Sequence, residues 1–392
     1  MINNKVGLAI VTYTINYGTF LQAFATQAAI RNLGYDTEIL NIESVIGDVS
    51  AARKKYFLRQ IFNFSELKSY RHILSAIIAK RIDRRYRDYM SHREKCFRTF
   101  AEKNFQIGEK CASWAGITAH CHDFSSVVVG SDQLWRPANI AGNFYTLNFV
   151  PDGVNKIAYA TSFGLSEIRK EQSEIAAAFL RRIQYLSCRE TSGTKIIRDL
   201  TGRSAEVVCD PTLLLTQKDW NSFLPAEPMV EGDYILVYLL SSNKDHRAYI
   251  KKLAKQTSCR IVGVLHGAGY IKGDEHHVDK APKDVGPFDF LNLIRHAKYV
   301  CTDSFHGSVF SAIFEKDFYV FKRFSDKDRM STNSRITGLL DELGLSQRLV
   351  ESYEELLLEP IDYKKVNENI EKFRSASLRF LSNALAQGIE VN

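Results

Sequence analysis

One continuous stretch, from Tyr299 to Arg323, carries the signals for a strand, a turn, a helix and a second strand. Tyr299–Thr302 is apolar and rich in β-forming residues, and Phe318–Phe321 repeats that pattern. Between them, Gly307 permits a tight turn and Ser308–Phe314 has the composition of a helix. Because strands joined through a helix lie parallel in one sheet, this order restricts the region to an open α/β domain.

Two positions in this stretch lie where such a domain binds ligands. Open α/β sheets bind small molecules at the carboxyl ends of their strands, where helix N-termini offer free amides to anions. His306 and Gly307 occupy that place, and Lys322 and Arg323 end the next strand. The pattern predicts an anionic small molecule as the guest. A histidine in a turn can equally be a helix cap or a core residue, and a Lys-Arg pair can simply face water.

The rest of the chain alternates strand and helix signals in the same way. A proline-rich stretch, Leu224–Asp233, separates a first block from a second one that begins at Tyr234. Alternation of this kind predicts parallel sheets with helices on their faces, and 392 residues exceed one ordinary core. We therefore predict two Rossmann-like α/β domains that face a cleft, residues 1–225 and 233–350, with a helical segment, 360–392, packing across the joint.

Residues 53–103 interrupt the alternation with an excess of positive charge. Fifteen Lys or Arg stand against five acidic residues there, in a chain whose net charge is +7. Apolar residues from Phe57 to Ile78 recur at spacings near three and four, which predicts a basic, amphipathic helical insertion in the N-terminal domain. Such a helix suits an anionic membrane surface, and a solvated insertion has the same pattern. Nucleic acid is not an expected partner, because no recognised binding module accompanies the charge.

The remaining sequence predicts a cytoplasmic protein, either free or at the inner face of the cytoplasmic membrane. No run reaches the roughly 20 apolar residues that a membrane span needs, and the N-terminal apolar run reads as a buried strand and not as a signal peptide. Cys121 stands between two histidines, and His276 adjoins His277. Neither cluster has the spacing that closes a tetrahedral site, so no metal is expected.

Several motifs, in this order and at these distances, resemble those of the polysaccharide pyruvyl transferase family. TDSFHG at Thr302 is similar to the family's T-D-S-F-H-G or R-L-H element. INYGTFLQ resembles its Asn-Tyr-Gly turn, and VVVGSDQLWRP resembles its G-S-D-Q-x-W loop. SCRETSG at Ser187 and CDPTLLL at Cys209 resemble a helix start and a strand end of the family. The resemblance runs from Ala9 to about Leu349 and implies the two-domain architecture of GT-B glycosyltransferases.

The family's reaction moves the enolpyruvyl carbons of phosphoenolpyruvate onto two hydroxyls of one sugar, which forms a cyclic pyruvate ketal and releases phosphate. The resemblance therefore implies phosphoenolpyruvate as a co-substrate and no cofactor. It implies an acceptor sugar in a surface polysaccharide precursor, such as a lipid-linked oligosaccharide. The donor's phosphate and carboxylate require cations and free amides. Its carbon 3 must gain a proton while a sugar hydroxyl attacks carbon 2, which requires an acid and a base.

The donor is expected mainly in the C-terminal domain. His306 is the expected acid, because an imidazolium beside a phosphate can bind the leaving group and supply a proton. Some family members have Arg two positions before this histidine, where the chain has Ser304. Another cation must then supply the missing charge. The expected donor-binding residues are Arg189, Ser304, His306, Gly307, Lys322, Arg323 and Arg335.

The acceptor sugar is expected in the N-terminal domain. Two loops that follow strands of one sheet should open on the same edge, and both are polar. Their side chains suit sugar hydroxyls, and one indole suits the apolar face of the ring. The expected acceptor-binding residues are Asn16, Tyr17, Gly18, Ser131, Asp132, Gln133 and Trp135. Asp132 is the expected base, with a turn-forming aspartate as the alternative role.

Two other functions remain open from the sequence. A GT-B glycosyltransferase that uses a nucleotide sugar would place a Glu on the helix after the glycine turn, followed by Gly-x-Pro. The corresponding stretch here is AIFEKDFYV, with Glu315 late in the helix and no Gly-x-Pro. A non-catalytic binding protein on the same scaffold would have lost the charged site residues, whereas His306, Arg189 and Lys322 are all present.

Overall fold

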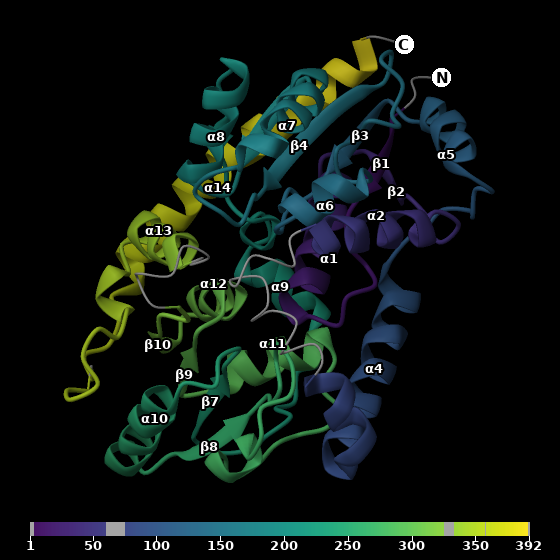
Figure 1. The fold of residues 1–392 in the computed structure, drawn as a ribbon. Coiled ribbons are helices and arrows are strands. Elements are labelled where there is room, and N and C mark those ends of the chain that lie inside the picture. Colours follow the sequence, from purple (N-terminus) through teal and green to yellow (C-terminus); the bar gives the residue numbers. More distant parts are fainter. Residues whose placement is uncertain (1–3, 60–74, 325–332, 357, 391–392) are drawn as a thin grey trace.

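Residues 4–59, 75–324, 333–356 and 358–390 are described by a computed structural model, and within them two parallel β-sheets form the centres of two α/β domains (Figure 1). The predicted mixed α/β fold with two Rossmann-like domains is confirmed. Each sheet is assembled from strands that are connected through helices, so every neighbouring pair of strands is parallel.

The N-terminal sheet has six strands in the order β2-β1-β3-β4-β5-β6. β3 and β4 are buried along their whole length, as expected of a sheet with helices on both faces. The strands are β1 (Lys5–Ala9), β2 (Asp36–Ile39), β3 (Ser126–Val129), β4 (Asn155–Thr161), β5 (Tyr185–Cys188) and β6 (Glu206–Val207). The helices of this domain are α1 (Tyr17–Asn32), α2 (Ile46–Arg59), α4 (Arg84–Asn104), α5 (Trp114–His120), α6 (Pro137–Gly142), α7 (Lys170–Arg182), α8 (Thr191–Thr201) and α9 (Gln217–Phe223).

The C-terminal sheet has four strands in the order β10-β9-β7-β8. Its strands are β7 (Tyr234–Tyr238), β8 (Arg260–Gly263), β9 (Tyr299–Thr302) and β10 (Asp317–Val320). The helices are α10 (Lys244–Thr257), α11 (Pro287–His296), α12 (Phe305–Ile313) and α13 (Asn333–Leu343). The strand, helix and strand expected between Tyr299 and Phe321 are β9, α12 and β10.

In each sheet, successive strands are added first on one side of the first strand and then on its other side. In the N-terminal sheet β1 lies between β2 and β3, and in the C-terminal sheet β7 lies between β8 and β9. At such a switch point the two neighbouring loops leave in opposite directions, and a crevice opens at the carboxyl ends of the strands. The loops after β1 and β3, and those after β7 and β9, are therefore the places where this fold can hold a ligand.

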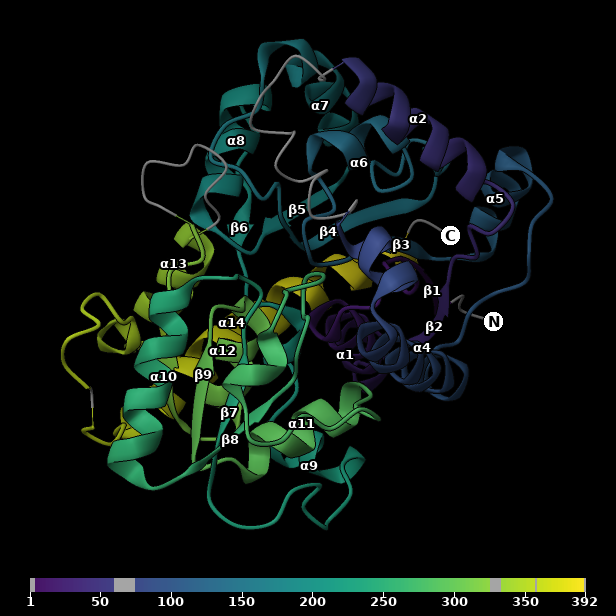
Figure 2. The same cartoon turned by 60° about the horizontal axis from the view of Figure 1, so that its bottom comes forward.

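The C-terminal helix α14 (Tyr363–Glu390) joins the two domains, and it runs along both of them in Figure 1 and Figure 2. Two residues of α14 bind the N-terminal domain: Ser377 Oγ accepts a hydrogen bond from Cys209 N at 2.9 Å, and Ala384 O accepts one from Asn155 Nδ2 at 2.9 Å. In the C-terminal domain, Asn369 Nδ2 donates to Leu343 O at 3.2 Å. The helix therefore holds both domains to one rigid element.

In the predicted basic insertion, residues 53–59 form the end of α2, residues 75–82 are helical and α4 follows Asp83, while residues 60–74 lie outside the described part. One face of α4 packs on the C-terminal domain (Figure 1). Arg93 Nη1 donates to His266 O at 3.2 Å, and Leu265 N donates to Tyr89 Oη at 3.0 Å. This face is an interdomain contact and is not solvated. Across the described ranges, no helix is both long and apolar enough for a membrane span.

Candidate active site

The candidate active site lies where the carboxyl edges of the two sheets meet. α1 and α12 are in contact there, at the junction of the domains in Figure 1. The N-terminal domain contributes the loops after β1, β3, β5 and β6, and the C-terminal domain contributes the N-terminal ends of α12 and α13. The charged side chains that these elements bring together are Asp132, Arg189, Glu190, Asp210, His306 and Arg335.

Asp210 is the centre of the cluster. One carboxylate oxygen, Oδ2, accepts hydrogen bonds from Arg189 Nη1 at 2.6 Å and Ser131 Oγ at 2.9 Å, and lies 3.4 Å from His306 Nε2. The other, Oδ1, accepts from the backbone N of Thr212 at 3.1 Å and its Oγ1 at 2.7 Å. Burial alone would raise the pKa of Asp210, but His306 and Arg189 hold that pKa well below its usual range. The carboxylate is therefore charged and joins three elements of both domains.

The guanidinium of Arg189 contacts Asp210 and Phe305 and leaves two of its nitrogens without hydrogen-bond partners among the described residues. Its guanidinium lies 4.3 Å from the ring centre of Phe305, in a cation–π contact across the domain junction. Its side chain is only 2% exposed, yet within the described part of the chain Nε and Nη2 have no hydrogen-bond partner. Glu190 Oε2 lies 4.0 Å from Nε, too far for a hydrogen bond. Buried guanidinium nitrogens in this state are a ready site for an oxyanion.

Glu190 is the second buried group without hydrogen bonds. Its side chain is 8% exposed, and neither carboxylate oxygen has a hydrogen-bond partner among the described residues. The carboxylate interacts electrostatically with Arg189 and with Arg335. Two free acceptor oxygens beside two cations can hold hydroxyl groups or accept their protons.

His306 lies in the first turn of α12 and not in a turn that precedes the helix. The helix starts earlier than predicted because Ser304 caps it: Ser304 Oγ accepts from Gly307 N at 3.3 Å. Gly307 is required for close packing and not for a left-handed turn, since a Cβ there would lie 2.5 Å from Thr302 Oγ1. The His306 ring faces Gly18 of the other domain, whose Cβ would lie 2.0 Å from Nδ1.

Asp132 has a strained backbone with a φ of 79°, in the left-handed region that non-glycine residues rarely adopt. Its Oδ2 accepts from Thr19 Oγ1 at 2.8 Å, and its Oδ1 accepts from Gln133 N at 2.8 Å. Burial would raise the pKa of Asp132, but Arg189, His306 and the Thr19 hydrogen bond lower it below its ordinary value. The residue is a fixed carboxylate on the N-terminal wall of the site.

Arg335 brings a second guanidinium from the C-terminal domain. Burial and, after it, the neighbouring Arg189 lower the pKa of Arg335 to about 10. Glu190 and Asp132 act in the opposite direction, and Arg136 adds a further positive charge. Arg335 Nε has no hydrogen-bond partner within the described residues. Two arginines that repel each other across the junction would both be stabilised by an anion placed between them.

The sequence placed four residues in the site that the structure assigns to packing or to other positions. Trp135 is fully buried, donates from Nε1 to Tyr145 O at 3.0 Å and packs on other aromatic rings, so its indole cannot stack on a sugar. Tyr17 is 1% exposed and donates to Val285 O at 2.9 Å, which makes it an interdomain contact. Lys322 lies near Tyr353, and Arg323 lies over the ring of Phe324; neither takes part in the described ion pairs around Asp210.

Two other predicted residues stabilise loops of the site. Asn16 caps α1, accepting from Thr19 N at 3.1 Å, and it is half-buried. Gln133 O accepts from Asn139 Nδ2 at 3.0 Å, while its side chain lies against Gly164. These positions hold Gly18 and Asp132 in place at the edge of the sheet.

Glu190, Asp210 and Thr19 are the site residues that sequence reasoning missed. Asp210 and Glu190 stand inside the motifs CDPTLLL and SCRETSG, three residues after β6 and two residues after β5. A carboxylate at the carboxyl end of a parallel strand was therefore the available signal. Thr19 carries no such signal, because its role depends on the loop after β3.

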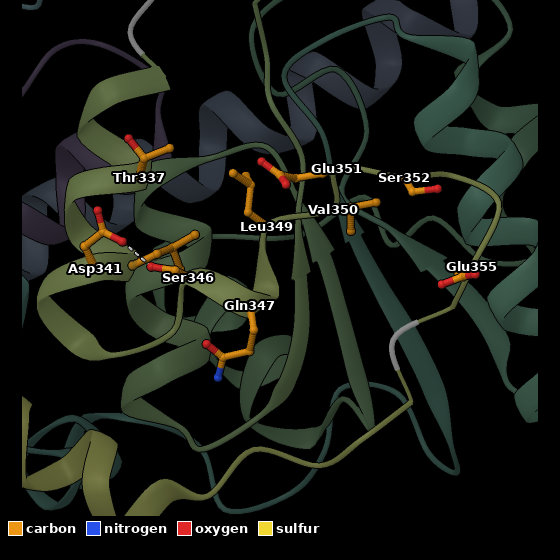
Figure 3. Close-up of a pocket in the computed structure, with 10 residues that line it drawn as sticks. Thr337, Asp341, Ser346, Gln347, Leu349, Val350, Glu351, Ser352 and Glu355 are labelled. Atoms are coloured by element: carbon orange, nitrogen blue, oxygen red, sulfur yellow. Dashed lines mark hydrogen bonds between the residues drawn. The ribbon is translucent and has the colours of Figure 1, made fainter.

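One hollow is lined by none of the residues of this cluster. A cavity of about 510 Å³ lies beside α13, where Figure 3 shows its lining side chains. Acidic groups, among them Asp341, Glu351 and Glu355, line it, so it does not suit an anionic donor. In the described part of the chain, no three His, Cys, Asp or Glu side chains are arranged so that they could hold a metal ion.

Comparisons with known proteins place this geometry in a family. A comparison with curated proteins gives no match. Similar solved structures include UDP-GlcNAc 2-epimerase from Methanocaldococcus jannaschii, at 12% identity and a TM-score of 0.44, with 94% of this chain and 92% of that one covered. They also include the glycosyltransferase SnogD from Streptomyces nogalater, at 14% identity and a TM-score of 0.40, with 98% of both chains covered. The family model described as polysaccharide pyruvyl transferase matches residues 16–323, and the chain belongs to that family.

Proposed function

We propose that the protein transfers the enolpyruvyl group of phosphoenolpyruvate to two hydroxyls of one sugar, which forms a cyclic ketal and releases phosphate. The observation that carries this proposal is the set of buried nitrogens without partners at the domain junction. Arg189 Nε and Nη2, Arg335 Nε and His306 Nε2 all lack an aligned hydrogen-bond acceptor within the described residues. Burial of such nitrogens destabilises the folded protein unless a bound ligand supplies acceptor oxygens.

The donor fits this set by charge and by chemistry. Phosphoenolpyruvate carries a carboxylate and a phosphate, and guanidinium groups bind both with paired, charge-assisted hydrogen bonds. Asp210 already offsets part of the positive charge of Arg189. Arg335 and Arg136 are therefore needed to balance the negative charges of the donor. The predicted replacement for the missing family arginine at Ser304 is, in this proposal, Arg335.

Proton transfers are assigned to groups on both sides of the donor. In the addition step carbon 3 gains a proton from His306, while one sugar hydroxyl forms a bond to carbon 2 and gives up its proton to Glu190 or Asp132. The bond from carbon 2 to the phosphate oxygen then breaks, the second hydroxyl bonds to carbon 2, and its proton leaves with the phosphate. Asp210 lies 3.4 Å from His306 Nε2 and would stabilise the imidazolium.

The acceptor is proposed to be a sugar of a surface polysaccharide precursor that is carried on a lipid, and the reaction to take place in the cytoplasm without a metal or cofactor. Glu190, with two free oxygens, can accept hydrogen bonds from two hydroxyls of one sugar at once. This pairing suits a reaction that joins two hydroxyls to one carbon.

A donor assay tests the proposal. The protein is incubated with phosphoenolpyruvate and a panel of lipid-linked and free glycans, and both phosphate release and the mass of the glycan are followed. We expect release of one phosphate for each ketal formed. A parallel panel of nucleotide sugars serves as the comparison. Glycosyl transfer from one of them, with no phosphate release from phosphoenolpyruvate, would contradict the proposal.

A further inference from the structure

An exposed apolar surface lies where helical residues 75–82 meet the start of α4. Three isoleucines there are unusually accessible: Ile77 is 51% exposed, Ile78 47% and Ile82 79%. Ile78 and Ile82 are four residues apart and share one side of the helix. Exposed cations surround them. We call this surface the basic corner, and it consists of Ile77, Ile78, Arg81, Ile82, Arg84 and Arg85.

The charges of the basic corner are available to a partner. Lys80 pairs with Glu94 at 2.5 Å, and Asp88 pairs with Lys283 at 2.5 Å, so these two acids are already paired with lysines. Arg81, Arg84 and Arg85 are exposed, and none of the three has an ion pair in the described part of the chain. Three arginines beside three isoleucines make a surface that is both cationic and apolar.

A hollow next to the isoleucines has the same character. Its volume is about 620 Å³, and its lining consists of Ser75, Ile78, Ala79, Ile82, Asp83, Arg84, Arg85 and Tyr270. Tyr270 is held in place because its Oη donates to Asp83 Oδ2 at 2.9 Å and its ring stacks on His266. The hollow therefore has apolar lining from two isoleucines and an alanine, with two arginines against one carboxylate, Asp83, at its side.

We propose that the basic corner binds the surface of a bilayer that contains anionic lipid. The isoleucines enter the boundary between headgroups and acyl chains, an acyl chain segment enters the hollow, and the arginines pair with lipid phosphates. Charge complementarity selects this occupant. Exposed apolar side chains that lie together mark an interaction surface, and the neighbouring cations favour an apolar phase with negative charges at its boundary.

The corner lies on the side of the molecule that carries the active site. Tyr270 follows β8, and the carboxyl ends of parallel strands share one edge of a sheet. The same edge carries Ser304 and His306 after β9, two strands away. A protein that lies on a bilayer through this corner would keep its site close to the lipid surface. The binding itself does not depend on the proposed reaction.

Sedimentation with vesicles tests the proposal. The full chain is mixed at low salt with vesicles of phosphatidylcholine and phosphatidylglycerol, and with vesicles of phosphatidylcholine alone. We expect binding only to the anionic vesicles, and weaker binding as salt shortens the range of the charges. The double variant Arg81→Gln with Arg85→Gln should bind roughly 20-fold more weakly, because each cation near such a surface contributes about fivefold. Ile78→Ser with Ile82→Ser should weaken binding by about tenfold or more.

Matched variants separate the corner from a general charge effect. Lys251→Gln with Lys255→Gln removes two exposed cations four residues apart on α10, and Ile175→Ser removes an isoleucine of 54% exposure on α7. Both should bind vesicles like the unaltered chain. Three results would overturn the proposal: no sedimentation of the unaltered chain, equal losses in the matched variants, or loss of self-association instead of vesicle binding in the isoleucine variant.

Discussion

A Cβ atom placed on Gly18 would lie 2.0 Å from Nδ1 of His306, so the first turn of α1 in one domain touches the first turn of α12 in the other. No side chain larger than hydrogen fits between them. Asp210, also in the N-terminal domain, lies 3.4 Å from the opposite nitrogen, Nε2. The imidazole of the C-terminal domain is therefore held between two elements of the N-terminal domain, and its position depends on how the domains meet.

Gly18→Ala should lower activity by displacing this imidazole. A shift of about 1 Å in a catalytic group can cost roughly a hundredfold in rate, and the Cβ leaves the His306 ring no room. We expect kcat to fall at least tenfold, with a small change in the thermal unfolding temperature. Gly47→Ala on α2 is the matched control, because nothing lies within 4 Å of a Cβ there. Equal activity in the two variants would show that the contact does not position His306.

His306→Gln should lower kcat by roughly a hundredfold or more, the usual scale for a general acid or base. Glutamine keeps a donor near Asp210 but does not release a proton at neutral pH. His122→Gln, on an exposed turn of the N-terminal domain, should leave kcat unchanged. Kinetics with phosphoenolpyruvate and a reactive acceptor measure both. A folded His306→Gln protein with turnover within a few-fold of the unaltered chain would remove the acid role.

The fold was predictable because each of its signals is local. The run from Tyr299 to Phe321 shows its strands and helix by apolar periodicity alone, and two blocks of that alternation give two parallel sheets. The edge on which the site lies was predictable for the same reason, since a residue directly after a parallel strand must stand at the carboxyl edge. His306 and Asp132 were predicted from this position, and Arg189 was predicted from its charge and its motif.

The direction of side chains and the meeting of the domains were not predictable from such signals. Trp135 stands in the right loop, but its indole is buried against Phe163 and Phe179, which depends on packing that spacing does not show. The role of Glu190 depends on its interaction with Arg335, which belongs to the other domain. Lys322 and Arg323 follow β10 as predicted, yet Lys322 lies near Tyr353 and Arg323 lies over the ring of Phe324.

Arg335→Gln should weaken the binding of phosphoenolpyruvate by roughly ten- to a hundredfold, because a hydrogen bond to a charged group contributes about 1.5 to 3 kcal/mol. Acceptor binding should change little. The fold should tolerate the change, since Arg335 Nε has no partner to lose among the described residues. Calorimetry with donor and acceptor measures the two affinities, and Arg198→Gln on an exposed face of α8 is the control. Unchanged donor affinity would assign the anion site to other cations.

Asp210→Asn should destabilise the protein at neutral pH by about 3 to 5 kcal/mol, because it leaves Arg189 buried without its counter-ion. The pKa of Asp210 is lower in the folded protein than in the unfolded chain. Its contribution is therefore complete above about pH 3.9 and is lost as the pH falls. Urea unfolding should show the difference between the two proteins shrinking by about 1.4 kcal/mol per pH unit below that value.

An exposed aspartate provides the comparison for this pH dependence. Asp199 pairs with Lys195 on α8 and is 54% exposed, so Asp199→Asn should change the free energy of unfolding by no more than about 1 kcal/mol at any pH. If Asp210→Asn behaves like Asp199→Asn, the carboxylate does not hold the cluster together.

Glu190→Gln should separate stability from activity. Both oxygens of this buried carboxylate lack hydrogen-bond partners among the described residues, so the charge is a cost to the folded protein before substrate binds. Glutamine has the same shape without that charge, and we expect the free energy of unfolding to stay equal or to rise. The same change removes a base and an acceptor for two hydroxyls, so kcat/KM for the sugar should fall by roughly a hundredfold or more, while the affinity for phosphoenolpyruvate should not fall. Urea unfolding, calorimetry with the donor and kinetics with varied acceptor measure the three quantities. A less stable and fully active Glu190→Gln protein would mean that the carboxylate only supports Arg189 and Arg335.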